Sequence, residues 1–142
     1  MEKFEFLEHT ADIKFKAYGR TVNEAFENSV GALVSYLSGG EKIADMKKKI
    51  ITIKGHDYES LLYSLLDELI FLLDAKGFIV SKSEIQVSGF NLKAKLYGDS
   101  VKNYSLDHVK AATYAEMHVK KVESKQKNKK ISYWEIQAVL DV

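Results

Sequence analysis

The chain has 142 residues and a net charge of +1, with 46% hydrophobic and 29% charged residues. This composition is typical of one globular domain over residues 1–142, and the balanced charge gives no overall field that would draw the protein onto nucleic acid or an anionic membrane. The absence of cysteine excludes disulfides, thiolate metal sites and cysteine nucleophiles. The sequence has neither a signal-peptide core nor a long apolar run. We therefore expect a cytoplasmic protein that does not span a membrane.

Two short strands are predicted near the N-terminus, over residues 3–7 and 13–18, with a polar loop at 8–12. In the second strand apolar and polar side chains alternate with the period of two that a half-buried strand shows. Asp12 shares its parity with the polar side chains and is expected to point away from the core. The loop carries a histidine, a hydroxyl and two carboxylates, which makes it a candidate site; an Asx or ST turn is the structural alternative.

Two long helices are predicted from apolar residues at helical spacing. The first follows a capping box at Thr21–Glu24 and ends at Gly39-Gly40. The second begins after Asp57, a favourable capping residue, and ends at Gly77. Because this second helix is the most hydrophobic element, we expect it at the centre of the core.

The remaining strands are expected over residues 50–54, 78–80, 85–88, 92–97, 111–122 and 132–142. Residues 123–130, between the last two, are lysine-rich and predict a polar hairpin loop. The order of elements favours a single α+β domain, with a mostly antiparallel sheet of about seven or eight strands and two long helices packed on one face.

A metal site is predicted where two strand ends carry carboxylates. Asp141 lies on the polar face of the last strand, as Asp12 does on the second, and the α-carboxylate of Val142 follows if that residue is the natural C-terminus. If the two strand ends meet, three anionic groups repel one another, and a hard cation such as Ca²⁺ or Mg²⁺ would offset them. The alternative is a frayed terminus with a solvated Asp141.

His9 and Lys110 are candidates for supporting parts in such a site. As a metal ligand, His9 would favour Zn²⁺ or another transition metal over Ca²⁺. Alternatively it would donate an N–H to Asp12 or Asp141 and orient that carboxylate, or it would only bond to the backbone of a turn. Lys110 precedes a strand of small residues, where its charge would neutralise the anionic site or hold a phosphate. A lysine that protects an edge strand from sheet-to-sheet pairing is the structural alternative.

The lysine-rich hairpin 123–130 is the most basic segment and would be able to contact RNA phosphates or an acidic partner. No aromatic residue lies inside this loop for base stacking, so a solvated loop is the simpler interpretation. The sequence contains no Walker loop, no G-x-S-x-G and no H-E-x-x-H motif. The residues alone therefore support an α+β domain with a carboxylate metal site and no assigned reaction.

Three segments together resemble the archease family. His9-Thr10-Ala11-Asp12, followed by a glycine and a capped helix, is similar to the family's N-terminal signature, and so are Val109–Tyr114 and the terminal segment Trp134–Val142. The resemblance covers the whole chain in order. One departure is Ala112, where related sequences often carry valine.

The resemblance implies a protein cofactor, not an enzyme. Archeases assist RtcB-type RNA ligases in tRNA splicing: they promote guanylylation of the ligase, hence multiple turnover, and broaden its nucleotide use. By this resemblance Asp12, Asp141 and Val142 would bind calcium, and Lys110 would be needed for ligase activation. The protein would contact RNA only indirectly, through the ligase complex.

Two other classes of function remain open from the sequence. One is a general chaperone-like modulator of DNA- and RNA-processing proteins. The other is a metal-dependent phosphoesterase that uses Asp12 and Asp141, although the chain offers this reaction neither a third side-chain ligand nor a clear general base.

Overall fold

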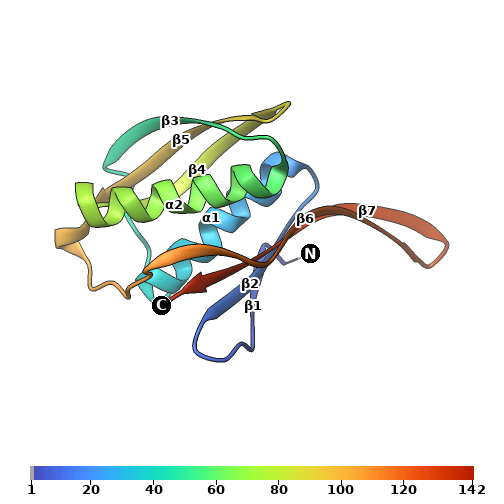
Figure 1. Cartoon of the computed structure of the whole chain (residues 1–142), viewed down its shortest axis with the longest axis horizontal. Coiled ribbons are helices and arrows are strands. Elements are labelled where there is room, and N and C mark those ends of the chain that lie inside the picture. Colours follow the sequence, from blue (N-terminus) through green and yellow to red (C-terminus); the bar gives the residue numbers. More distant parts are fainter. Residues whose placement is uncertain (1) are drawn as a thin grey trace.

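Seven strands and two long helices make up most of residues 2–142, the part of the chain that the computed structural model describes (Figure 1). In chain order the elements are β1 (Phe4–Leu7), β2 (Ile13–Gly19), α1 (Val22–Ser38), β3 (Lys47–Lys54), α2 (Tyr58–Lys76), β4 (Phe78–Ser88), β5 (Asn91–Ser100), the 3-10 turn η1 (Val101–Asn103), β6 (Ala111–Gln126) and β7 (Lys129–Asp141). No helix in residues 2–142 is long and apolar enough to cross a membrane.

The strands form two antiparallel sheets, one of four strands in the order β1–β2–β7–β6 and one of three in the order β3–β5–β4. Helix α1 packs against β2 and β4, and α2 packs against β6, β4 and β3, so the helices lie between the sheets (Figure 1). The predicted α+β class, with antiparallel strands and two long helices, is confirmed. The strands are divided between two sheets rather than joined in one. Both helices are apolar on more than one side, and each sheet covers one of these sides.

The helix ends follow the local signals in the sequence. Thr21 Oγ1 accepts a hydrogen bond from the amide of Glu24 at 3.1 Å, and Asp57 Oδ1 accepts one from the amide of Ser60 at 2.7 Å. Gly39 and Gly77 end the helices in the left-handed conformation, with φ of 64° and 61°. That conformation costs glycine nothing and strains other residues.

Helix side chains also bond to the open edges of the two sheets. Asn23 Oδ1 accepts from the amide of Val87 at 2.9 Å, and Glu27 Oε2 accepts from the amide of Ile85 at 2.8 Å, so α1 satisfies donors on the edge strand β4. Burial raises the pKa of Glu27 above its usual value. An edge strand with unpaired N–H groups would invite pairing with other chains, and these contacts prevent it while fixing α1 to the sheet.

The core lies between the helices and the inner faces of both sheets. Its largest fully buried side chains are Phe15, Phe26, Leu33, Leu61, Leu62, Leu65, Leu66, Ile79, Leu92, Leu96, Ile136 and Leu140. Burial of each such side chain contributes about 1.5–3 kcal/mol. Helix α2 supplies four of the leucines, as its hydrophobicity predicts.

Several strands are longer than the sequence pattern predicts. β4 runs without a break from Phe78 to Ser88, with a bulge between Val80 and Lys82, where the pattern predicts two separate strands. β6 and β7 continue through the predicted loop 123–130 to a two-residue turn at Lys127 and Asn128, both with positive φ. Such a turn matches the twist of a hairpin, and main-chain pairing does not require apolar side chains.

Candidate functional site

Strand pairing brings the predicted site residues to one end of the four-stranded sheet. Ile13 of β2 pairs with Leu140 of β7, so Asp12 and Asp141 follow at neighbouring strand ends. On the other side of β7, Ala111 pairs with Asp141, and the amide of Lys110 donates to the Asp141 carbonyl at 2.8 Å. Asp12, Lys110 and Asp141 therefore share one end of the sheet with Val142, and we call these four residues the tip. Figure 1 marks the C-terminus of the chain at this end of β7.

The tip is open to solvent. Lys110 and Asp141 are exposed, and the Asp12 side chain retains 32% of its accessible surface. A shallow hollow of about 660 Å³ lies along the loop between β1 and β2, lined by Leu7, Glu8, His9, Thr10, Asp12 and Ile13. In residues 2–142 no lysine or arginine forms an ion pair with Asp12 or Asp141. Both carboxylates are thus available to a cation or a partner.

His9 contacts Glu116 rather than the tip aspartates. Its Nε2 lies 2.9 Å from Glu116 Oε2, whereas its Nδ1 lies 3.9 Å from Asp12 Oδ2, beyond hydrogen-bond distance. Lys14 Nζ donates to the other oxygen of Glu116 at 3.2 Å. Glu116 therefore holds both the loop, through His9, and strand β2, through Lys14.

A bulge in β6 places Glu116 in this position. The pairing passes from Thr113 opposite Val139 directly to His118 opposite Gln137, so four residues of β6 face one residue of β7. Glu116 has a φ of 54°, a conformation that non-glycine residues rarely adopt, and its carbonyl accepts from Gln137 Nε2 at 2.7 Å. Strain of this kind persists where surrounding contacts compensate for it, often at functional sites.

The bulge interrupts the alternation of side chains along β6. Regular alternation over residues 111–122 would put Ala112 and Val119 on opposite faces, whereas the structure buries both, Ala112 at 4% and Val119 at 8% exposure. A bulge shifts the parity of the strand beyond it. The sequence does not predict the contact of Glu116 with His9 for the same reason: no glycine or proline marks the bulge.

The contacts of Glu116 make the loop sensitive to acid. The hydrogen bond with His9 and the ammonium of Lys14 lower the pKa of Glu116 from its usual value. The stabilisation from this carboxylate is therefore complete above its unfolded pKa, about 4.3, and is lost as the pH falls through the lower pKa of the folded state.

We expect Glu116→Gln to free the loop at residues 8–12 at neutral pH, because an amide is a poorer partner for His9 and Lys14 than a carboxylate. Backbone relaxation by NMR at about pH 6 and about pH 3 would measure this, with the wild-type loop ordered only at the higher value. Glu84→Gln, at an exposed carboxylate on β4, serves as the control. If the loop of the Glu116→Gln variant were as rigid at about pH 6 as the wild-type loop, the anchoring by Glu116 would be contradicted.

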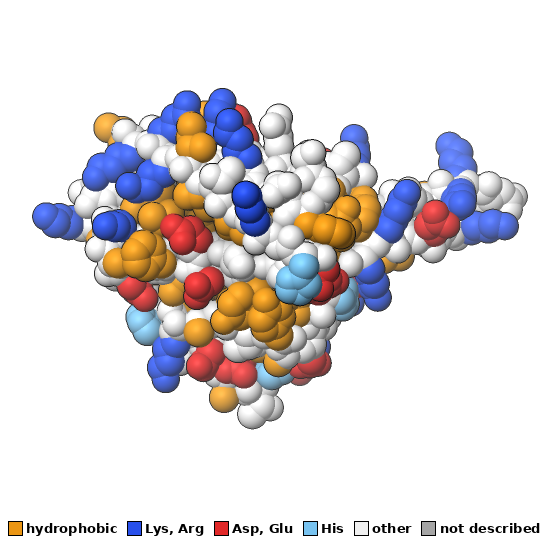
Figure 2. Space-filling view, turned by 45° about the horizontal axis from the view of Figure 1, so that its top comes forward, with side chains coloured by type: hydrophobic (Ala, Val, Ile, Leu, Met, Phe, Trp, Pro, Cys, Tyr) orange, Lys and Arg blue, Asp and Glu red, His pale blue; other side chains and the backbone are white. Residues whose placement is uncertain are grey.

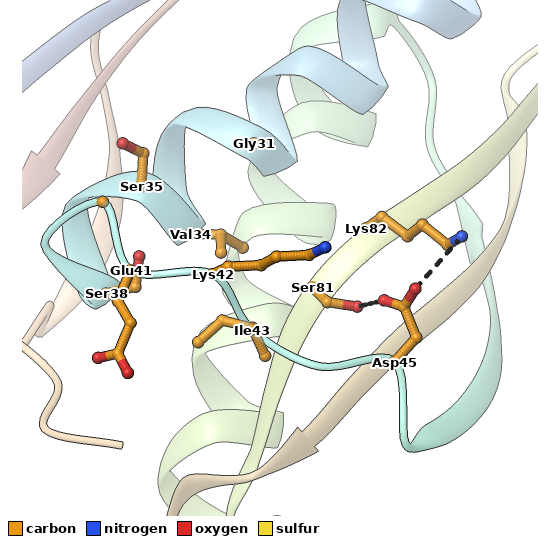
Figure 3. A pocket seen from close by; sticks show the side chains of 11 residues that line it. Gly31, Val34, Ser35, Ser38, Glu41, Lys42, Ile43, Asp45, Ser81 and Lys82 are labelled. Carbon is orange, nitrogen blue, oxygen red and sulfur yellow. Dashed lines mark hydrogen bonds and ion pairs between the residues drawn. The ribbon is translucent and has the colours of Figure 1, made fainter. Parts of the chain in front are cut away.

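A second hollow lies between α1 and the edge strand β4, with a volume of about 450 Å³ (Figure 3). Ser81 donates a hydrogen bond to Asp45, and Lys82 Nζ lies 3.4 Å from the same carboxylate. Both contacts join the segment before β3 to β4. The Asp45 carboxylate is therefore occupied by protein contacts, and we assign this hollow a structural part.

The carboxylates of residues 2–142 do not make a metal centre from side chains alone, since no group of three or more histidine, aspartate or glutamate side chains is close enough to hold an ion. The predicted site differs from such a centre because it combines two side chains with the carboxylate of Val142.

Residues 4–142 match the model of the Archease protein family (MTH1598/TM1083). The chain belongs to the archease family. It is 35% identical to the protein archease of Pyrococcus abyssi, covering 86% of this chain and 91% of that protein, and 35% identical to the protein archease of Pyrobaculum islandicum, covering 98% and 95%. The family resemblance carried by the motifs at residues 9–12, 109–114 and 134–142 is thereby confirmed.

The archease fold is also seen in a solved structure. The solution structure of Methanobacterium thermoautotrophicum protein 1598 superposes with a TM-score of 0.75 at 27% identity and covers 100% of both chains. The whole described chain, including the two sheets and the helices between them, thus has a counterpart among known structures.

Proposed function

We propose that this protein is an activator of an RtcB-type RNA ligase and is not itself a catalyst. Membership of the archease family supports a protein-cofactor role. The observation that carries the proposal further is the strand pairing that puts Asp12, Lys110 and Asp141 together at one exposed end of a sheet. A rigid sheet end with clustered charges is suited to enter the cleft of a larger enzyme.

Calcium fits the donor set of the tip. Asp12, Asp141 and the carboxylate of Val142, where this is the natural C-terminus, offer only oxygen ligands, which Ca²⁺ prefers. Neither aspartate is neutralised by a lysine or arginine in residues 2–142. When bound, the ion would supply a hard positive centre for phosphate oxygens. His9 and Glu116 would then keep the loop that carries Asp12 in position.

Lys110 would neutralise negative charge on the phosphate groups that react in the ligase. Transfer of a guanylyl group requires neutralisation of phosphate oxygens, and a lysine ammonium is a compact point charge on a flexible stem. The backbone of Lys110 is fixed by its hydrogen bond to Asp141, while its side chain is exposed. It can therefore reach a phosphate in the ligase while remaining attached to the tip.

The test is a multiple-turnover ligation assay with an RtcB-type ligase, in which guanylylated ligase is measured in the same reactions. Asp12→Asn, Asp141→Asn and Lys110→Ala are each expected to reduce stimulation to near the ligase-alone rate, because each removes one charged group of the tip. Calcium titration calorimetry on the two aspartate variants should show the loss of binding without loss of fold.

Matched controls are Asp67→Asn and Lys125→Ala, which make the same chemical changes at exposed positions that do not belong to the tip. These should stimulate the ligase like the wild type. Full stimulation by all three tip variants would overturn the proposal. Hydrolysis of phosphoesters by the purified protein, lost in the aspartate variants, would instead favour a metal-dependent phosphoesterase.

A further inference from the structure

The outer face of the three-stranded sheet is bare. Helices cover its inner face, and no element of residues 2–142 packs on the other. The pairing register places these side chains on the outer face: Lys48, Ile50, Thr52 and Lys54 of β3; Asn91, Lys93, Lys95 and Tyr97 of β5; and Lys82, Glu84, Gln86 and Ser88 of β4.

This face is strongly basic although the whole protein is nearly neutral. Its outward positions carry five lysines and a single carboxylate, Glu84. We call Lys48, Lys54, Lys82, Lys93 and Lys95 the basic face. Figure 2 shows lysine side chains gathered over the upper part of the molecule, where β3 and β5 lie, while most acidic side chains in view lie lower.

The lysines of the basic face are largely uncompensated. In residues 2–142 only Lys82 forms an ion pair, with Asp45 at 3.4 Å. Lysines on β3 have a structural explanation, since charge on an edge strand prevents unwanted pairing. Lys93 and Lys95 lie on the central strand β5, where that explanation fails. In the ladder Glu84 lies opposite Lys95, whereas Lys93 lies between Thr52 and Gln86 and has no carboxylate opposite it. The charge of Lys93 is therefore available to an anion.

We propose that the basic face binds the phosphate backbone of RNA. Side chains on one face of a sheet repeat about every 7 Å along a strand and about 5 Å between strands, so the lysines form a flat array that a polyanionic strand can cross. Tyr97 and Ile50 lie within the array and provide apolar contact for sugars and bases. Lysine holds phosphate as a point charge without reading base edges, so the binding is independent of sequence.

RNA fits this face better than an acidic protein does. Interfaces between proteins are depleted in lysine and enriched in aromatic residues, methionine and arginine, whereas the outer face of the three-stranded sheet has five lysines, one tyrosine and no arginine. The face lies on the other sheet from Asp12 and Asp141. The inference therefore goes beyond ligase activation and can hold or fail independently of it.

The test is fluorescence anisotropy with a labelled single-stranded RNA of about 20 nucleotides at salt concentrations from about 50 to about 200 mM. Contact with about four phosphates predicts about 50-fold weaker binding at the higher salt. The double variant Lys93→Gln/Lys95→Gln should lower the slope of log K against log salt by about 1.4 and weaken binding about tenfold at about 200 mM.

The control is Lys125→Gln/Lys127→Gln, which removes the same charge from the β6–β7 hairpin and should bind like the wild type. Lys48→Gln/Lys54→Gln on β3 is a second test of the same face, and thermal melting of each variant checks its fold. The proposal is overturned if the hairpin variant loses binding and the Lys93→Gln/Lys95→Gln variant keeps it. It is equally overturned if the wild type binds polyglutamate or phosphatidylserine vesicles, which are anionic but contain no RNA, and does not bind RNA.

Discussion

Phe26→Ala is expected to lower the free energy of unfolding by about 3–5 kcal/mol. Phe26 is fully buried on α1, between the two sheets. Its removal would lose the transfer free energy of the ring and leave a cavity that the surrounding side chains fill only in part. Since a domain of this size is stable by about 5–15 kcal/mol, the loss is a large fraction of the total.

Urea denaturation would measure this loss, with Phe71→Ala as the matched control. Phe71 lies on α2 with 49% of its surface exposed, so the same chemical change should cost less than about 1 kcal/mol. At about 4 °C per kcal/mol, the Phe26→Ala variant should also melt roughly 12–20 °C below the wild type. Equal losses in the two variants would contradict the position of the core.

Helix boundaries could be predicted because they depend on neighbouring residues. Thr21 caps α1 through Glu24, three residues later, and Gly77 ends α2 in the left-handed conformation. Each signal lies within one turn of the element that it ends. The buried leucines of α2 were likewise visible in the helical spacing of the sequence.

Bulges could not be predicted because they depend on the partner strand. Nothing near Glu116 distinguishes it from other residues in an alternating strand, yet the register of β6 against β7 changes there. The bulge of β4 after Val80 is similar. The choice of partner strand also decides which strands share a sheet. Alternation along one strand shows which side chains face a core, but it does not show the partner. The division into two sheets therefore follows only from the structure.

The tip was partly predictable. Parity along β2 and β7 places Asp12 and Asp141 on polar faces, but their meeting requires β2 to pair with β7, which lies more than a hundred residues later. The family resemblance supplied that link before the structure did. Glu116 had no such support, and its contact with His9 changes the part we assign to His9 from direct orientation of Asp12 to anchoring of the loop.

The two sheets offer different surfaces to different partners. The tip ends the four-stranded sheet and exposes carboxylates with one lysine, whereas the basic face covers the three-stranded sheet. The helices between them keep the two surfaces at a fixed separation. A ligase engaged at the tip would therefore leave the basic face free for RNA, and variants of one surface should not alter the other.

Gly98→Ala is expected to cost about 3 kcal/mol or more, because β4 crosses close to β5 at this glycine. A Cβ at Gly98 would lie 2.1 Å from the carbonyl oxygen of Ile79 and 2.8 Å from Cζ of Phe78. The first of these is a backbone atom, fixed by the pairing of Val80 with Gly98 next to the bulge of β4. Neither strand can retreat without breaking ladder hydrogen bonds, so the clash must separate them.

Gly31→Ala is the matched control and should behave in the opposite way. Gly31 lies inside α1, and an added Cβ would meet Phe4 Cε2 at 3.5 Å, an ordinary contact. Alanine in a helix is favoured over glycine by about 0.5–1 kcal/mol, so this variant should melt at or above the wild-type temperature. Thermal unfolding followed by circular dichroism compares the two. If the Gly98→Ala variant were as stable as the Gly31→Ala variant, the backbone of β4 at Ile79 would not lie as close to Gly98 as it does in this structure.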